Sequence, residues 1–336
     1  LQQMKDATRE LQILLCHPST VAIARMQRAT SAALITRRII TATSLTDAYH
    51  IVEHQRPDCI ILQSGLAACP DFELLGCLLK KLGVGCVIWY QPNGLSARLK
   101  QFEFHHFEGE HSMAALKESI FLATSHSIAG STRSMPSQQI DTYDPRKIVM
   151  IGASTGGVDA LTKVLCHFNA KTPPTLVVLH TGARFISSLI RLLDGLTKAT
   201  VQVASHDLAL KRGHVYLAPT DTHHLTVSPK DDRRIALAAA DPVNGHRPSI
   251  DALFKSGARI APHIVAGLLT GMGQDGARGL LALRRAGAHT IVQDQATSVV
   301  YGMPRVAAEL GAAIAQLPID HIGPALLKAA RPDMRL

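Results

Sequence analysis

Three polar residues that could together perform nucleophilic catalysis lie far apart in this sequence. Ser154, His180 and Asp275 each lie at the end of an apolar segment or shortly after one. A serine hydroxyl is a poor nucleophile until a base takes its proton, and the base in turn needs a carboxylate to orient it. The three residue types therefore indicate acyl-transfer chemistry, provided that the fold brings them together.

The strongest local pattern surrounds Ser154. The segment IGASTGG follows the apolar run KIVMI and precedes the helical pattern VDALTKVL, so Ser154 is predicted at a strand-to-helix turn. Glycines permit a tight turn there, and free amides at a helix start favour developing negative charge. The alternative is a glycine-rich turn that binds phosphate or only packs closely. The letters G-x-S-x-G also fit the α/β-hydrolase elbow, but the chain order serine, acid, histidine of that fold is not found.

His180 and Asp275 are each ambiguous when taken alone. His180 ends the strand pattern TLVVLH, where a histidine is often structural. Asp275 lies in GLLTGMGQDG, where it could simply cap a helix predicted over 277–285. Their common position at strand ends is what favours catalysis.

Short apolar runs alternate with amphipathic stretches along the whole chain, which indicates α/β architecture with parallel sheets. The predicted strands are 11–16, 59–62, 86–89, 148–151, 176–179, 215–217, 264–269 and 290–292. The predicted helices are 21–33, 45–54, 158–166, 187–193 and 277–285. Parallel strands present functional residues at their carboxyl ends, so the three candidates are expected at one edge of one sheet.

Length and composition favour a two-domain protein of the cytoplasm. The chain has 336 residues, of which 46% are hydrophobic, and it contains no apolar run long enough to span a membrane. Its first residues lack the apolar core of a signal peptide. The six cysteines form no CxxC pair and no zinc spacing, so we expect buried, reduced thiols and no metal.

The net charge of +9 is uneven, because about +8 of it lies after residue 146. A basic surface favours an acidic partner. Aromatic residues make up only 4% of the chain, which argues against a platform for stacking single-stranded nucleic acid. An acidic protein surface is therefore the expected partner, with no nucleic acid and no membrane insertion.

The stretch 125–146 is rich in Ser, Thr, Gln, Pro and Gly and has no apolar period, so it is predicted to be a linker. It separates a domain over 9–124 from a second domain over 147–336.

The second domain resembles the catalytic domain of the bacterial chemotaxis protein-glutamate methylesterases. The resemblance is carried, in the expected order, by IGASTGG, the strand ending in His180, GHVYLAPTDTHH, HRPSIDALF, GLLTGMGQDGARGL and AGAHTIVQDQATSVVYGMPR. It covers nearly all of 147–320. It implies a serine hydrolase that removes methyl groups from glutamate side chains on the cytoplasmic helices of chemoreceptors, and that in some members deamidates glutamine.

The same resemblance assigns roles to individual residues. Ser154 matches the nucleophile, His180 the general base and Asp275 the third member of the triad. The amide of Met272 matches a donor of the oxyanion hole, and Thr155 is expected to support it. No metal and no organic cofactor are implied. One departure is the run Thr181–Ile186, where the family commonly has Met-Pro-Pro and a Phe-Thr pair; this predicts an altered choice of target.

The first domain resembles the receiver domain that this family usually carries, so we expect a flavodoxin-like sheet followed by a doubly wound, Rossmann-like sheet. The receiver's chemistry is missing. Its phosphoacceptor position falls on Gln63, and its magnesium-binding acidic pair falls on His17 and Pro18. The switch position falls near Tyr90 and the lysine position near Glu108 or Gly109. Without a carboxylate oxygen or a bound cation, phosphoryl transfer is not expected.

Several alternatives stay open at this stage. A shifted alignment would make Asp58 or Asp71 the phosphoacceptor. The glycine-rich turn could hold a nucleotide in a Rossmann-like regulatory protein, although no G-x-G-x-x-G pattern is present. The chain could also be a catalytically weak scaffold, or a regulator that docks to other sensory-pathway proteins. A DNA-binding regulator is disfavoured because no recognition-helix pattern is found.

Overall fold

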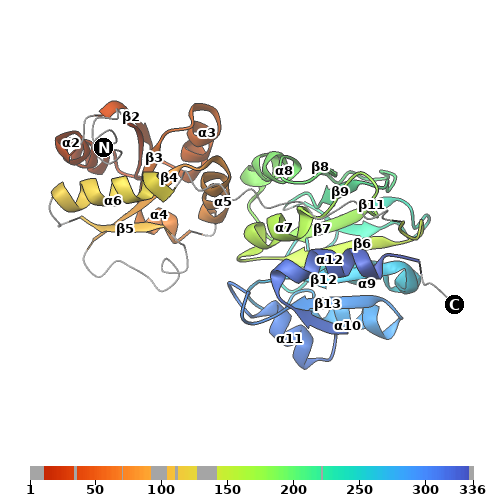
Figure 1. Cartoon of the computed structure of the whole chain (residues 1–336). Coiled ribbons are helices and arrows are strands. Elements are labelled where there is room, and N and C mark those ends of the chain that lie inside the picture. Colours follow the sequence, from red (N-terminus) through yellow and green to blue (C-terminus); the bar gives the residue numbers. More distant parts are fainter. Residues whose placement is uncertain are drawn as a thin grey trace. The chain divides into compact units, whose positions relative to one another are not determined.

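The computed structural model describes residues 11–33, 36–69, 71–91, 104–109, 113–126, 142–220 and 222–332. The chain divides into two compact units between residues 136 and 137. Each unit contains its own parallel sheet, and each is described here by itself (Figure 1).

The N-terminal unit is a five-stranded parallel sheet of order β2-β1-β3-β4-β5. Its strands are β1 Leu11–Cys16, β2 Thr36–Ala42, β3 Cys59–Gln63, β4 Gly85–Tyr90 and β5 His105–Glu108. Its helices are α2 Thr20–Ala33, α3 Leu45–Gln55, α4 Ser64–Ala67, α5 Phe72–Leu82 and α6 Met113–His126. The strand order is flavodoxin-like, as expected, and it reverses between β1 and β3. The central strands are apolar because helices cover both faces of the sheet.

The C-terminal unit is built on a seven-stranded parallel sheet of order β14-β13-β12-β6-β7-β9-β8. Its strands are β6 Ile148–Ala153, β7 Thr175–Leu179, β8 Thr200–Val203, β9 His214–Leu217, β12 Ile264–Leu268, β13 His289–Gln293 and β14 Ala315–Leu317. A separate antiparallel pair consists of β10 His224–Val227 and β11 Ile235–Ala238.

Helices cover both faces of this second sheet, so it is doubly wound, as expected. The helices are α7 Gly157–Leu165, α8 Ile186–Asp194, α9 Ile250–Ser256, α10 Ala277–Arg285, α11 Met303–Glu309 and α12 Ile319–Ala329, with 3-10 turns η2 Ala183–Phe185 and η3 Ala258–His263. Helix α7 packs against α8 and α12, whereas α10 packs against α9 and α11. The strand order reverses between β6 and β12, which is the position where open parallel sheets bind ligands.

The predicted strands and helices are all present within a few residues, and the structure adds elements that sequence patterns did not predict. Six strands among the described residues were not predicted. Of these, β5, β8, β10, β11 and β14 have three or four residues each, which is too short to show a period. The sixth, β2, has seven residues, TRRIITA, in which polar residues interrupt the apolar ones. Helix α6 continues through His126, two residues into the expected linker, and residues 127–141 lie outside the described residues.

The six cysteines are unpaired, as expected, but their burial differs from the prediction. Cys16, Cys59 and Cys86 are buried within strands, whereas Cys69 and Cys166 are exposed because they lie near helix ends. No helix in the described part of the chain combines the length and apolar composition needed to cross a membrane.

Candidate active site

Ser154 is the first residue after β6, in a turn held by main-chain hydrogen bonds. Its amide donates to the carbonyl of Thr270 at 3.0 Å, and its carbonyl accepts from the amide of Gly157 at 2.8 Å. Gly156 has a φ of +82°, and a Cβ there would lie 2.5 Å from Cβ of Val299. Only glycine therefore fits this position, and the turn leads directly into helix α7.

His180 starts from a position beside Ser154 on the neighbouring strand. Residues Ala153 of β6 and Leu179 of β7 are register partners, and the amide of His180 donates to the carbonyl of Ala153 at 3.1 Å. Neighbouring strands lie about 4.8 Å apart. Ser154 and His180 are the first residues after these two strands, so their side chains can reach each other.

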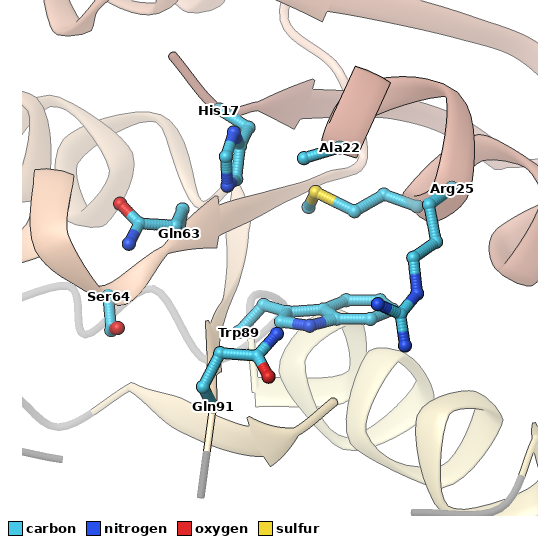
Figure 2. A pocket seen from close by; sticks show the side chains of 8 residues that line it. His17, Ala22, Arg25, Gln63, Ser64, Trp89 and Gln91 are labelled. Carbon is cyan, nitrogen blue, oxygen red and sulfur yellow. The ribbon is translucent and has the colours of Figure 1, made fainter. Parts of the chain in front are cut away.

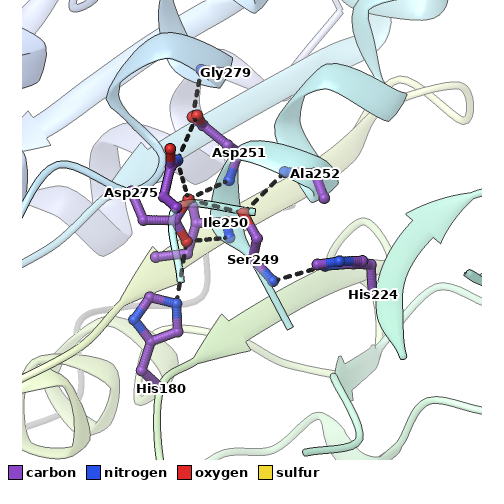
Figure 3. A network of polar contacts seen from close by, with 9 residues as sticks. His180, His224, Ser249, Ile250, Asp251, Ala252, Asp275 and Gly279 are labelled. Carbon is purple, nitrogen blue, oxygen red and sulfur yellow. Dashed lines mark hydrogen bonds and ion pairs between the residues drawn. The ribbon is translucent and has the colours of Figure 1, made fainter. Parts of the chain in front are cut away.

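Asp275 reaches the same edge from the loop after β12 and pairs with His180. Its Oδ2 atom lies 3.1 Å from Nε2 of His180, and the Asp275 side chain is only 1% exposed (Figure 3). Because an ionised carboxylate only accepts hydrogen bonds, Nε2 carries the proton. Nδ1 is then the basic atom of the neutral ring.

The start of helix α9 holds the Asp275 carboxylate in place. The amides of Ile250 and Asp251 donate to it at 2.7 and 3.2 Å, and the hydroxyl of Ser249 donates at 2.8 Å. The side-chain amide of Asn244 donates at 3.1 Å. Free amides at a helix start favour an anion, so this helix end is a receptacle for the carboxylate.

These contacts decide the charge of Asp275. Burial by itself raises the pKa of this carboxyl group, but the hydrogen bonds from His180, the Ile250 amide, Ser249 and Asn244 lower it by more. The net result is a pKa well below the ordinary aspartate range, so Asp275 is an anion at neutral pH.

A second layer of polar groups surrounds this receptacle, and all of them except the exposed Asn244 are buried. Asn244 also donates to Asp251 at 3.0 Å, and Asp251 accepts from the amide of Gly279 at 2.6 Å. The amide of Ser249 donates to Nδ1 of His224 at 3.0 Å, and His224 is 2% exposed (Figure 3). The network fixes the start of α9 against α10 and against β10.

A second imidazole covers the face of His180. The rings of His180 and His246 are stacked, with centroids 3.9 Å apart and an angle of 8° between their planes. Burial lowers the pKa of His246, the charge of His180 lowers it further, and Asp275 opposes both effects. His246 is therefore favoured as a neutral ring that fixes the plane of His180.

The contact between Ser154 and His180 is the part of the triad that is not closed. Nδ1 of His180 is buried and has no hydrogen-bond partner among the described residues, Ser154 included. In enzymes without bound substrate, catalytic hydrogen bonds are often long and tighten only when substrate is present. The structure thus joins His180 to Asp275 and leaves the basic nitrogen available.

Met272 and Thr155 lie against the nucleophile turn. A Cβ placed on Gly271 would lie 2.7 Å from Cβ of Ser154, so the backbone that leads to Met272 passes directly beside the nucleophile. The Met272 side chain is 74% exposed. The carbonyl of Thr155 accepts from the Thr270 hydroxyl at 2.9 Å, which ties the two turns together.

Sequence reasoning missed most of the supporting residues. Asn244, His246, Ser249 and Asp251 lie within or just before the segment HRPSIDALF, which pointed to the family but not to individual roles. Thr270 is 1% exposed and lies two residues before Met272. The signal that could have identified Thr270 is a polar residue shortly after a buried strand.

Gln63 lies in the N-terminal unit, at the carboxyl end of β3. Its Oε1 accepts from the amide of Leu66 at 3.0 Å, which caps the short helix α4. Asp58 and Asp71 were the two alternative phosphoacceptors. Asp58 precedes β3, at the amino edge of the sheet, and its carboxylate accepts a hydrogen bond from the amide of Gln12 at 2.8 Å. Asp71 precedes α5, well beyond the strand end.

Within the described part of the chain, one group of three potential metal ligands lies close together: His50, Glu53 and His54 of α3. It belongs to the N-terminal unit and includes none of the residues around Ser154.

Comparison with known proteins agrees with this geometry. The model of the family described as CheB methylesterase matches residues 149–326. In solved structures, the C-terminal unit resembles the crystal structure of the Thermotoga maritima CheB methylesterase catalytic domain, at 35% identity and a TM-score of 0.52. That match covers 54% of this chain and 97% of the other.

Curated relatives carry the name protein-glutamate methylesterase/protein-glutamine glutaminase. The one from Gluconobacter oxydans is 52% identical over 184 residues, which cover 54% of this chain and about half, 52%, of that relative. One from Rhizobium johnstonii is 38% identical over 304 residues, covering 85% of this chain and 88% of that relative. The matched family model and this long alignment show that the chain belongs to the CheB methylesterase family.

Proposed function

We propose that this chain hydrolyses methyl esters of glutamate side chains on a protein, with Ser154 as nucleophile, His180 as general base and Asp275 as the orienting acid. The observation that carries the proposal is the pair between His180 and a carboxylate held by the start of α9. That pair ends beside the turn that presents Ser154.

In the first step, the hydroxyl oxygen of Ser154 attacks the ester carbonyl while Nδ1 of His180 takes its proton. Asp275 stabilises the imidazolium that forms, because its own charge is fixed by burial among donors. The imidazolium then protonates the departing methoxide, and methanol leaves. A glutamyl ester of Ser154 remains.

In the second step, the neutral imidazole of His180 takes a proton from water, which attacks the carbonyl of the acyl-enzyme. The imidazolium then returns the proton to the Ser154 oxygen as its bond to the acyl carbon breaks, which releases the glutamate carboxylate and restores the serine. The oxyanion of each tetrahedral intermediate is assigned to the amide of Met272, with Thr155 holding the adjacent turn. Such a preorganised donor contributes about 3–4 kcal/mol to the barrier reduction.

The proposed substrate is the cytoplasmic helical domain of a methyl-accepting chemoreceptor, whose acidic surface would suit the net positive charge of residues 147–336. Unpaired cysteines fit a cytoplasmic location for this encounter. The turn η2, with the exposed Arg184, begins three residues after His180 and is proposed to contribute to target choice.

We also propose a second activity, the hydrolysis of glutamine side chains to glutamate, because the relatives are named protein-glutamine glutaminase as well as protein-glutamate methylesterase. The same steps would apply, with ammonia as the leaving group in place of methanol.

The proposed activity predicts methanol release from methylated receptor fragments, and Ser154→Ala should reduce that release by at least about a thousandfold while the protein stays folded. Ser187→Ala, which removes an exposed serine of α8, is the matched control and should keep full turnover. Undiminished turnover of Ser154→Ala would remove the nucleophile assignment.

The nucleotide-binding alternative is less well supported. The space beside the glycine turn is occupied by protein: a Cβ on Gly156 would meet Val299 at 2.5 Å, and one on Gly152 would meet Ile250 at 2.2 Å. A fluorophosphonate should label the wild-type protein and spare Ser154→Ala, whereas tight nucleotide binding without labelling would favour the alternative.

A further inference from the structure

A small pocket of about 100 Å³ opens at the carboxyl edge of the N-terminal sheet (Figure 2). Its lining residues are His17, Ala22, Arg25, Met26, Gln63, Ser64, Trp89 and Gln91. His17 follows β1 and Gln63 ends β3, so the pocket lies where the strand order reverses. This is the position at which sheets of this order bind their ligands.

The polar groups of the pocket include several hydrogen-bond donors, among them the Arg25 guanidinium. The amide of Ser19 donates to Nδ1 of His17 at 2.9 Å, so Nδ1 is an acceptor and Nε2 carries the proton. Burial lowers the pKa of His17, which favours this neutral form. Figure 2 shows the His17 ring above one end of the Trp89 indole and the Arg25 side chain extending to the other end.

The charge of the pocket excludes the usual magnesium site of a receiver. None of the lining residues is acidic, and Arg25 forms no ion pair within the residues that the structure describes. Gln63 carries an amide and no carboxylate, and its Oε1 already accepts the hydrogen bond that caps α4. It is therefore a poor ligand for a cation. An anion with acceptor oxygens complements this set of donors.

The apolar part of the pocket suits a flat group. The indole of Trp89 is only 8% exposed and is braced by the edge of Phe107, with ring centroids 5.0 Å apart. The buried side chain of Met26 lines the same space. Thioether and indole both pack well against aromatic rings. The volume is below the roughly 300–1,000 Å³ of sites for drug-sized ligands, which excludes a nucleotide or flavin.

We propose that the N-terminal unit binds a small aromatic carboxylate at this edge, with its ring against Trp89 and its carboxylate toward Arg25. The inference does not rest on the proposed esterase activity. The edge of the sheet at which a receiver domain would accept phosphate would here bind an organic anion.

The test uses the full chain and its own fluorescence, since Trp89 is the only tryptophan. Benzoate should change the emission of Trp89 saturably, whereas the neutral isostere benzamide should bind at least about tenfold more weakly because it lacks the charge. Magnesium chloride alone should leave the emission unchanged.

Two arginines of α2 provide matched variants. Arg25→Gln should weaken benzoate binding at least about tenfold, and Arg28→Gln, an exposed position outside the pocket, should leave it unchanged. The proposal is overturned if benzoate gives no saturable change, if benzamide binds equally well, or if both variants behave alike. Inorganic phosphate that binds as tightly as benzoate would also overturn it, because the ring would then contribute nothing.

Discussion

At the scale of single residues, the site is organised around one buried carboxylate. Asp275 accepts hydrogen bonds from two main-chain amides and from the side chains of His180, Asn244 and Ser249. These donors satisfy the lone pairs of both oxygens, so the carboxylate has a single orientation and stays ionised. The position of the His180 ring follows from the position of this group.

This arrangement predicts a strong effect of Asp275→Asn. An amide in this receptacle would place its NH2 group against donors, and it would not stabilise an imidazolium. We expect turnover to fall by three to four orders of magnitude, roughly as in other serine triads. Asp207→Asn, which changes an exposed aspartate, should have no such effect.

The same carboxylate predicts how stability depends on pH. The folded-state pKa of Asp275 is lowered, so its contribution is fully present above the unfolded pKa of about 4 and is lost as pH falls toward the folded value. The free energy of unfolding of wild type should therefore exceed that of Asp275→Asn by a constant amount above about pH 5, and the difference should shrink below about pH 4. Denaturant titrations at several pH values measure this; a difference that grows on acidification would contradict it.

A glycine beside the nucleophile gives a steric prediction. A Cβ on Gly271 would lie 2.7 Å from Cβ of Ser154 and 2.6 Å from the sulfur of Met303. Gly271→Ala should therefore displace the nucleophile turn, lower stability by about 1–3 kcal/mol and reduce turnover sharply. Gly267→Ala, on the preceding strand, meets Leu326 only at 3.5 Å and should be tolerated in both measurements.

At the scale of elements, three strand ends and one helix start form the site. Strands β6, β7 and β12 are adjacent in the sheet, which brings together residues up to 121 positions apart in the chain, Ser154 and Asp275. Helix α9 contributes its amino end, and its cap residue Ser249 both accepts from the amide of Ala252 and donates to Asp275. The start of the helix thus belongs to the candidate site.

This double use of a cap can be tested with Ser249→Ala. Losing the cap should cost about 1 kcal/mol of stability, and losing the hydrogen bond to Asp275 should lower kcat about ten- to a hundredfold with little change in KM. Ser44→Ala removes a similar cap from α3 in the N-terminal unit, where Ser44 accepts from the amide of Asp47 at 3.1 Å. It should cost similar stability without altering kcat; equal loss of kcat in both variants would contradict the positioning role.

At the scale of the whole molecule, a unit with a predicted Ser-His-Asp hydrolase site is linked to a flavodoxin-like unit. The sequence predicts that this unit is a receiver domain without the usual carboxylates. We expect that acetyl phosphate with magnesium neither adds mass to the full chain nor raises its turnover, because Gln63 offers only an amide and His17 and Pro18 bind no cation. Gln63→Asp alone should not restore phosphorylation, because His17 and Pro18 would still provide no carboxylate to bind magnesium. A mass increase of one phosphoryl group on the wild-type chain would overturn this expectation.

Comparing turnover of the full chain with that of residues 147–336 then separates two roles for the N-terminal unit. Faster turnover of the shorter chain indicates inhibition by the N-terminal unit, and equal turnover on a small ester with slower turnover on receptor indicates docking.

The sequence by itself determined the architecture and the three candidate catalytic side chains. The alternation of apolar runs and amphipathic stretches is a local property, and residues that follow buried parallel strands must come to one edge of a sheet. Ser154, His180 and Asp275 could therefore be found from the strands that precede them. The absence of receiver chemistry stays a prediction, which rests on the residue types that follow each strand.

Only the tertiary structure decided which groups hold these side chains. The stacking of His246 on His180, the capture of Asp275 by the start of α9 and the bridge from Asn244 to Asp251 all join segments whose distance no local pattern encodes. The pocket beside Trp89 is of the same kind, since residues from three strand ends and two helices form it. Contacts between distant segments depend on packing, and a linear pattern specifies packing only through the fold that it produces.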